Sequence, residues 1–173
     1  MRSLIPALAL AAFVATPAFA QDKMSNDDQS AMKQLASANL AEIASGKMAA
    51  SKAQNPEVKK FAQQMVTDHS KMLEDLKSLA KSKGVALPQD PPAKEMAQTK
   101  LLERKSGAEF DKDYMEHMVK DHEKDVKDTE SIASKAKDPQ FKSAVQQANT
   151  KIKEHLQLAQ RVAQNAGAGS SSK

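Results

Sequence analysis

Residues 55–84 read NPEVKKFAQQMVTDHSKMLEDLKSLAKSKG, the pattern of one long amphipathic helix. Asn55 is a favourable N-cap, Pro56 suits the first helical position, and Gly84 is a typical C-terminal stop. Between these signals apolar residues recur every three or four positions, as one buried helix face requires. They are Val58, Phe61, Ala62, Met65, Val66, Met72, Leu73, Leu76, Leu79 and Ala80.

Three more stretches have the same helical period. One covers residues 31–53, before the Asn55-Pro56 signal. Another follows Ser106-Gly-Ala-Glu109, which has the pattern of a capping box, and carries Phe110, Tyr114, Met115, Met118, Val119, Val126, Ile132 and Ala133. The last follows Asp138-Pro139, a repeat of the earlier turn signal, and runs from Phe141 to Ala163. The sequence therefore predicts an all-α fold of four long helices.

The connections between these helices predict their order in space. The turns at Asn55 and Asp138 are tight, which indicates two antiparallel helical hairpins. The link between the hairpins, about residues 83–106, contains Pro88, Pro91 and Pro92 and room for a short helix over 93–104. Such a link is long enough to run back along a helix of about 40 Å, the crossover of a ferritin-like four-helix bundle, although an up-down-up-down bundle stays open. We expect the bundle to cover residues 31–165.

Both ends of the chain differ from this central part. Residues 1–20 have a positive start, an apolar run and the small-residue signal Ala18-Phe19-Ala20, the pattern of a secretory signal peptide cleaved after Ala20. We therefore expect a periplasmic or secreted protein. Residues 21–30 are polar and are expected to be flexible, and the Gly/Ser-rich residues 166–173 are expected to be a disordered tail.

Composition excludes several classes of function. The chain has no Cys, which excludes disulfides, thiolate metal sites and a lipid anchor on cysteine. Its net charge of +4 comes from 26 Lys and Arg scattered among 22 Asp and Glu, so no nucleic-acid partner is predicted. After the first 20 residues no apolar run is long enough to span a membrane. No nucleophile-base pair or phosphate-binding loop can be read, so an enzyme is not the favoured interpretation.

An ionisable residue interrupts each apolar stripe near its middle. Residues 65–69, Met-Val-Thr-Asp-His, also recur as Met-Val-Lys-Asp-His at 118–122. Counting at 1.5 Å per residue from the two turns puts all four interruptions about 20–25 Å from a turn, at mid-height of the bundle and pointing inward. These residues are Glu42, His69, His122 and His155.

Three interpretations of this layer stay open. One Glu and three His have the composition of a transition-metal site, with Asp68 and Asp121 orienting the imidazoles from outside it. The favoured interpretation is a buried hydrogen-bonded network that fixes helix register, since buried polar groups need partners whatever their function. The third is that the His side chains face water at the stripe edge. A carboxylate-bridged di-iron site is disfavoured, because the sequence has no Glu-x-x-His. Methionines on the stripes are expected to fill the core rather than to bind copper.

Several motifs resemble a known protein family. They are Phe61-Ala62-x-x-Met65-Val66-x-Asp68-His69, Gly84-Val85-x-Leu87-Pro88, and Phe110-Asp111-x-x-Tyr114-Met115-x-x-Met118-Val119-x-Asp121-His122. The chain resembles, over about residues 31–164, a family of exported bacterial proteins described as a domain of unknown function, often labelled "predicted outer membrane protein" and grouped with ferritin-like folds. The resemblance implies a four-helix fold and supplies no activity.

We therefore expect an exported, soluble four-helix bundle, a non-enzymatic binding or stress-related protein of the cell envelope with no assigned partner. The alternative is a metal-binding or metal-dependent redox protein that uses Glu42, His69, His122 and His155. The sequence leaves a homo-oligomer open.

Overall fold

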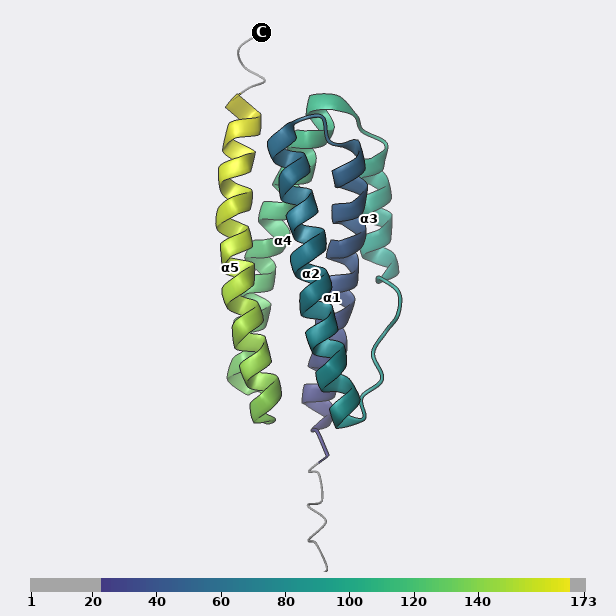
Figure 1. Ribbon diagram of the computed structural model, residues 1–173, viewed down its shortest axis with the longest axis vertical. Coiled ribbons are helices and arrows are strands. Elements are labelled where there is room, and N and C mark those ends of the chain that lie inside the picture. The colour runs from purple at the N-terminus through teal and green to yellow at the C-terminus, as the bar shows by residue number, and fades with distance from the viewer. Residues whose placement is uncertain (1–22, 169–173) are drawn as a thin grey trace, which may run out of the picture.

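The computed structural model describes residues 23–168, which form five helices and no strand (Figure 1). The all-α prediction is confirmed for this part of the chain. The helices are α1 (Asn26–Lys52), α2 (Pro56–Lys83), α3 (Ala93–Glu103), α4 (Gly107–Lys135) and α5 (Pro139–Ala168). The expected signal peptide, residues 1–20, lies outside the described residues. No described helix is long and apolar enough to cross a membrane.

The four long helices lie alongside one another, and the short α3 lies on the outside (Figure 1). Helices α1 and α2 pack together as one antiparallel pair, and α4 and α5 pack as the other. After α2 the chain runs back past α3 to the opposite end before α4 begins, so α2 and α4 point the same way (Figure 1). This path matches the long connection expected over about residues 83–106.

Helix α1 begins five residues before the expected start at residue 31. The Ser25 hydroxyl accepts a hydrogen bond of 3.1 Å from the Asp28 N–H, and Asp27 and Asp28 lie in the first turn, where acids favour the positive end of the helix dipole. The segment expected to be flexible, 21–30, is therefore helical from Asn26 onward. At the other end α5 continues to Ala168, beyond the expected limit of 165, and residues 169–173 lie outside the described part.

The residues predicted to cap α2 do so, whereas the capping box predicted at the start of α4 does not form. The Asn55 side chain accepts from the Glu57 N–H at 2.8 Å, and Gly84 ends α2 with a left-handed φ of 67°. Ser106 makes no side-chain cap, so the capping box predicted with Glu109 is wrong. Glu109 instead pairs with Lys105 at 3.1 Å, because the lysine lies one turn earlier on the same face.

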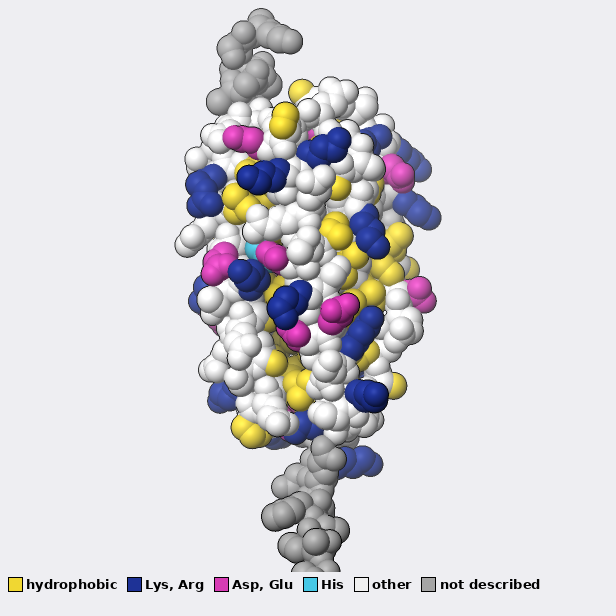
Figure 2. Space-filling model, viewed as in Figure 1, with side chains coloured by type: hydrophobic (Ala, Val, Ile, Leu, Met, Phe, Trp, Pro, Cys, Tyr) yellow, Lys and Arg dark blue, Asp and Glu magenta, His cyan; other side chains and the backbone are white. Residues whose placement is uncertain are grey.

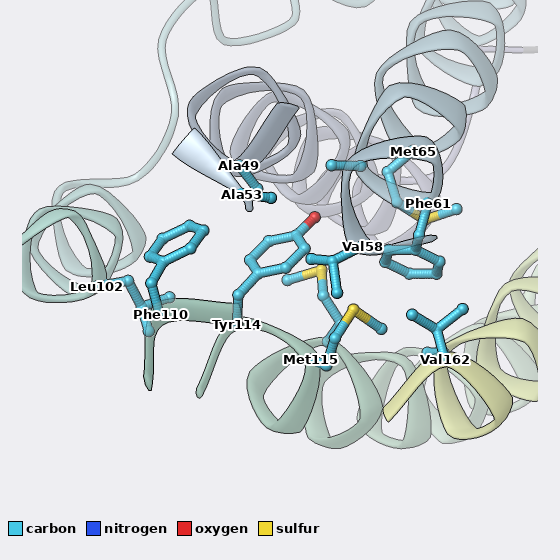
Figure 3. Close-up of a cluster of buried hydrophobic side chains, with 13 residues drawn as sticks. Ala49, Ala53, Val58, Phe61, Met65, Leu102, Phe110, Tyr114, Met115 and Val162 are labelled. Carbon is cyan, nitrogen blue, oxygen red and sulfur yellow. The ribbon is translucent and has the colours of Figure 1, made fainter. Parts of the chain in front are cut away.

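Two apolar clusters fill opposite ends of the molecule. One contains Phe61, Phe110, Tyr114 and several methionines and lies next to the α1–α2 turn (Figure 3). In it the Tyr114 ring stacks on Phe110 and meets Phe61 edge-on. The other, near the α4–α5 turn, includes Leu73, Leu76, Phe141 and Val145. Gly46 allows α1 to approach α2, since a Cβ there would lie 2.9 Å from the Val66 side chain. The buried methionines, Met24, Met32, Met65, Met115 and Met118, act as core residues.

Two buried aspartates join the hairpins reciprocally. Asp111 on α4 accepts from the Gln54 and Asn55 N–H groups, at 3.2 and 2.7 Å, in the α1–α2 turn. Asp28 on α1 accepts from the Lys137 and Asp138 N–H groups in the α4–α5 turn, the shorter bonds being 3.1 and 2.8 Å. Each hairpin thus supplies a carboxylate acceptor for the backbone N–H groups in the turn of the other hairpin. These contacts fix how the two pairs of helices align.

Candidate metal centre

Three histidines from three different helices meet between the two apolar clusters. His69 comes from α2, His122 from α4 and His155 from α5, and their side chains are 2%, 0% and 0% exposed. Their ring centroids are 5.2–5.8 Å apart. One ring nitrogen from each lies within 4.8 Å of one from each of the others. The structure therefore brings together the three histidines of the layer expected from the sequence.

Asn39 of α1 fixes the protonation of His69. The Asn39 amide nitrogen donates to the Leu35 carbonyl at 2.8 Å, so its Oδ1 is the atom that faces His69 Nδ1, at 3.0 Å. An amide oxygen can only accept a hydrogen bond. His69 Nδ1 must therefore carry the proton of the ring, and His69 Nε2 carries a lone pair.

Acceptors fix the other two rings in the same way. His122 Nδ1 lies 2.9 Å from the Met118 carbonyl oxygen, and His155 Nε2 lies 2.8 Å from a carboxylate oxygen of Asp68. Each of these nitrogens is the donor, because neither a carbonyl nor a carboxylate oxygen has a proton to give. The proton of each neutral imidazole is thus directed away from the cluster.

Three buried lone pairs remain without partners. The nitrogens left over are His69 Nε2, His122 Nε2 and His155 Nδ1, and none has a hydrogen-bond partner. No two of these rings can bond one another, since none has a second proton while neutral. Burial lowers the pKa of all three, which keeps the rings neutral, although the Asp68 hydrogen bond opposes the shift at His155. Leaving a buried acceptor unpaired costs about 1–3 kcal/mol.

A metal ion would satisfy all three lone pairs at once. Three imidazole ligands with an open fourth position occur in zinc enzymes, with Zn–N bonds of about 2.0–2.1 Å and hence nitrogens about 3.3 Å apart. The ligand nitrogens of the three histidines lie within 4.8 Å of one another here. The outer partners Asn39, Met118 and Asp68 match the acceptors that orient metal-binding histidines in general.

Glu42 lies apart from the three ring nitrogens. Its side chain is buried and one carboxyl oxygen has no partner, yet it does not belong to the group of converging ligand atoms. Burial, with a contribution from Asp121, raises the pKa of Glu42 to about 8. Glu42 and His69 both line a cavity of about 470 Å³ that extends from this layer.

The two aspartates expected to orient the histidines behave differently. Asp68 holds His155 on a neighbouring helix. Asp121 pairs with His117, the fourth histidine, at 3.1 Å on its own helix, and no contact joins it to the three converging rings. His117 also bonds Gln98 of α3 and stays outside the cluster.

Sequence reasoning missed Asn39, Asp125 and the two aspartates at the turns. A signal for most of them was present, because Asp28 and Asp111, Glu42 and Asp125, and Asn55 and Asp138 are each separated by 83 residues. These pairs occupy equivalent positions in the two hairpins. The spacing links the first helix to the third and the second to the fourth, whereas the Met-Val-x-Asp-His repeat links the second to the third.

Comparisons with known proteins identify a family and no activity. No curated protein and no solved structure matches the chain. A family model described as Domain of unknown function (DUF4142) matches residues 14–162. This match covers most of the sequence, including all three converging histidines, and the chain therefore belongs to the DUF4142 family of unknown function.

Proposed function

We propose that the protein binds one transition-metal ion through His69, His122 and His155. The observation that carries the proposal is the set of three buried ring nitrogens whose protonation is fixed by outward hydrogen bonds, so that three lone pairs converge without a donor. A hydrogen-bonded network of these residues alone leaves all three lone pairs unpaired. A single water could donate to two of them, and a metal ion accepts all three.

The donor set favours certain ions. Three neutral imidazoles without a thiolate suit Zn²⁺, Cu²⁺, Fe²⁺ or Ni²⁺, whereas Mg²⁺ and Ca²⁺ prefer oxygen ligands. Glu42 is proposed to lie outside the ligand set, near enough to the cavity to influence charge there. The proposal is one of metal binding, and no group in the layer supplies a nucleophile or an identified substrate contact.

The proposal also includes a fold type and a location for the protein. The crossover path between α2 and α4 supports a four-helix bundle of ferritin-like type, although the ligands differ from the Glu-x-x-His pattern of ferritin-like di-iron sites. The apolar run and cleavage pattern of residues 1–20 support export to the periplasm or beyond the cell, where the protein would act as a binding protein.

Metal analysis tests this function. The gently purified protein should retain close to one metal ion per chain, measured by plasma mass spectrometry. Adding the same metal to stripped protein should raise the melting temperature, because binding the native state at a hundred times Kd stabilises it by about 2.7 kcal/mol.

Two single-histidine variants provide the comparison. His122→Ala should lose both the retained metal and the thermal shift. His117→Ala should keep both, since His117 lies on the same helix but outside the cluster. Wild-type protein that holds no metal and gives no thermal shift with Zn²⁺, Cu²⁺, Fe²⁺ or Ni²⁺ would rule the proposal out.

A further inference from the structure

The cavity of about 470 Å³ is large for an ion and has mostly apolar walls. It extends from the histidine layer toward the cluster at the α4–α5 turn, and residues from all five helices line it. Its apolar wall includes Leu35, Met72, Leu76, Val145 and Ile152. Its volume falls within the range of about 300–1,000 Å³ typical of small-molecule sites.

Acidic side chains from α1, α2, α3 and α4 line this cavity, and two of them, Glu42 and Asp125, lie at equivalent positions in the two hairpins. Glu42 on α1 is 6% exposed, lines the cavity, and has a buried carboxyl oxygen without a partner. Asp125, the equivalent residue on α4, lines the same cavity. Burial, with a contribution from the charge of Glu42, raises the pKa of Asp125 to about 7.

Three of the four lysines that line the cavity have acids as partners, and the fourth, Lys94, is exposed on α3. Lys71 pairs with Asp75 at 3.0 Å, and Lys124 pairs with Asp128 at 2.8 Å. Lys124 comes only to 3.9 Å from Asp125. The lysine side chains of these pairs are 75% and 68% exposed, so they belong to the cavity mouth. Charges of both signs alternate over the face drawn in Figure 2, without a continuous patch of either.

The size and walls of the cavity decide which cation it suits. A hard divalent ion takes six or more oxygen ligands, and Glu42 and Asp125 together offer four. The apolar wall would contribute nothing to such an ion. An organic cation uses both parts, because its ammonium group can take the place of the protons that Glu42 and Asp125 hold near neutral pH, while its hydrocarbon body replaces water along the wall.

We propose that this cavity binds a small organic cation, a primary amine whose ammonium group lies between Glu42 and Asp125 and whose apolar body packs against Leu35, Met72 and Val145. This site borders the three-histidine metal site at His69 and would exist in metal-free protein. Anions of the same shape are disfavoured, since Glu42 and Asp125 would repel them and three of the four lysines of the lining already pair with acids.

Calorimetric titration of the full mature chain in chelator tests the proposal. The probes are hexylamine, hexanol and hexanoate, which share one hydrocarbon chain and differ in charge. Hexylamine should bind with one site per chain and at least tenfold more tightly than hexanol, and hexanoate should bind more weakly than either. Equal affinity for the three probes, or preference for hexanoate, would overturn the proposal.

Matched variants locate the binding. Glu42→Gln and Asp125→Asn should each weaken hexylamine binding at least tenfold, whereas Asp75→Asn, at the cavity mouth, should leave it unchanged. Binding that survives both Glu42→Gln and Asp125→Asn would refute the site, as would Mg²⁺ or Mn²⁺ binding that depends on Glu42 in a protein without affinity for hexylamine. The hexylamine titration is done in chelator and so does not depend on bound metal. If hexylamine does not bind, the metal proposal is unaffected, and if the protein binds no metal, the hexylamine result still holds.

Discussion

Single buried residues give the protein two opposite responses to pH. Burial lowers the pKa of His69, His122 and His155 below 6.5, so the unfolded state takes up protons first and stability declines as pH falls through that value. Glu42 and Asp125 have raised pKa values, about 8 and about 7, and act in the other direction. The sequence suggested only a net loss of stability between about pH 7 and 5, because it did not reveal the two buried acids as a pair.

Glu42→Gln should separate these responses. Folded Glu42 holds its proton up to about pH 8, whereas the unfolded side chain loses it near its ordinary pKa of 4.5. Its contribution to stability is therefore full below 4.5 and is lost as pH rises toward 8, with a slope of up to about 1.4 kcal/mol per pH unit. Glutamine stays neutral, so the stability of the variant relative to wild type should increase between pH 5 and 8.

Urea unfolding of metal-free protein at several pH values measures this difference. Glu116→Gln, an exposed acid on α4, is the control and should give a difference that does not change with pH. If the Glu42→Gln and wild-type curves run parallel from pH 5 to 8, Glu42 is solvated and ionised in the folded protein, contrary to its burial here.

At the scale of whole elements, the reciprocal aspartates set the alignment of the hairpins. Asp28 and Asp111 are 3% and 4% exposed, and each accepts from two backbone N–H groups of the other hairpin. Hydrogen bonds to a charged group contribute about 1.5–3 kcal/mol, and a buried donor left unpaired costs about 1–3 kcal/mol. These contacts join elements that are far apart in the sequence.

Asp111→Ala should therefore destabilise the protein by about 2–4 kcal/mol, because two N–H groups at the α1–α2 turn lose their acceptor. Asp111→Asn keeps one acceptor oxygen and should cost less. Asp75→Ala removes only an exposed pair with Lys71 and should change stability by less than about 1 kcal/mol. Chemical unfolding measures all three, and an Asp111→Ala protein as stable as Asp75→Ala would show that the turn contacts contribute nothing.

The elements were more predictable than the contacts between them. Asn55, Pro56 and Gly84 gave the limits of α2, because caps and breakers act within a few residues. The start of α1 was missed, since Ser25 and Asp28 lie in a polar stretch without an apolar stripe. Counting residues along a helix placed Glu42 in the interior, where it is buried, but did not show that it lies outside the group of three histidine nitrogens. Asn39 could not be predicted as the partner of His69, because a hydrogen bond between helices depends on tertiary packing.

For the molecule as a whole, the central feature is a polar layer between two apolar ends. The helix order brings His69, His122 and His155 to one point, and residues from α1, α2 and α4 direct their protons outward. The Met-Val-x-Asp-His repeat predicted that two helices carry a histidine at the same place, and the structure adds the outward hydrogen bonds on which the proposed metal site rests. The central claim is that three defined nitrogens bind one metal ion together.

Long-range ¹H–¹⁵N correlation of the histidine rings, before and after Zn²⁺ is added, tests this claim most directly. In metal-free protein near pH 7.5, His69 and His122 should carry the proton on Nδ1 and His155 on Nε2. One equivalent of Zn²⁺ should then shift the three unprotonated nitrogens together and leave both nitrogens of His117 in place. A proton on Nε2 of His69 or His122, or ring signals that Zn²⁺ does not change, would contradict the account.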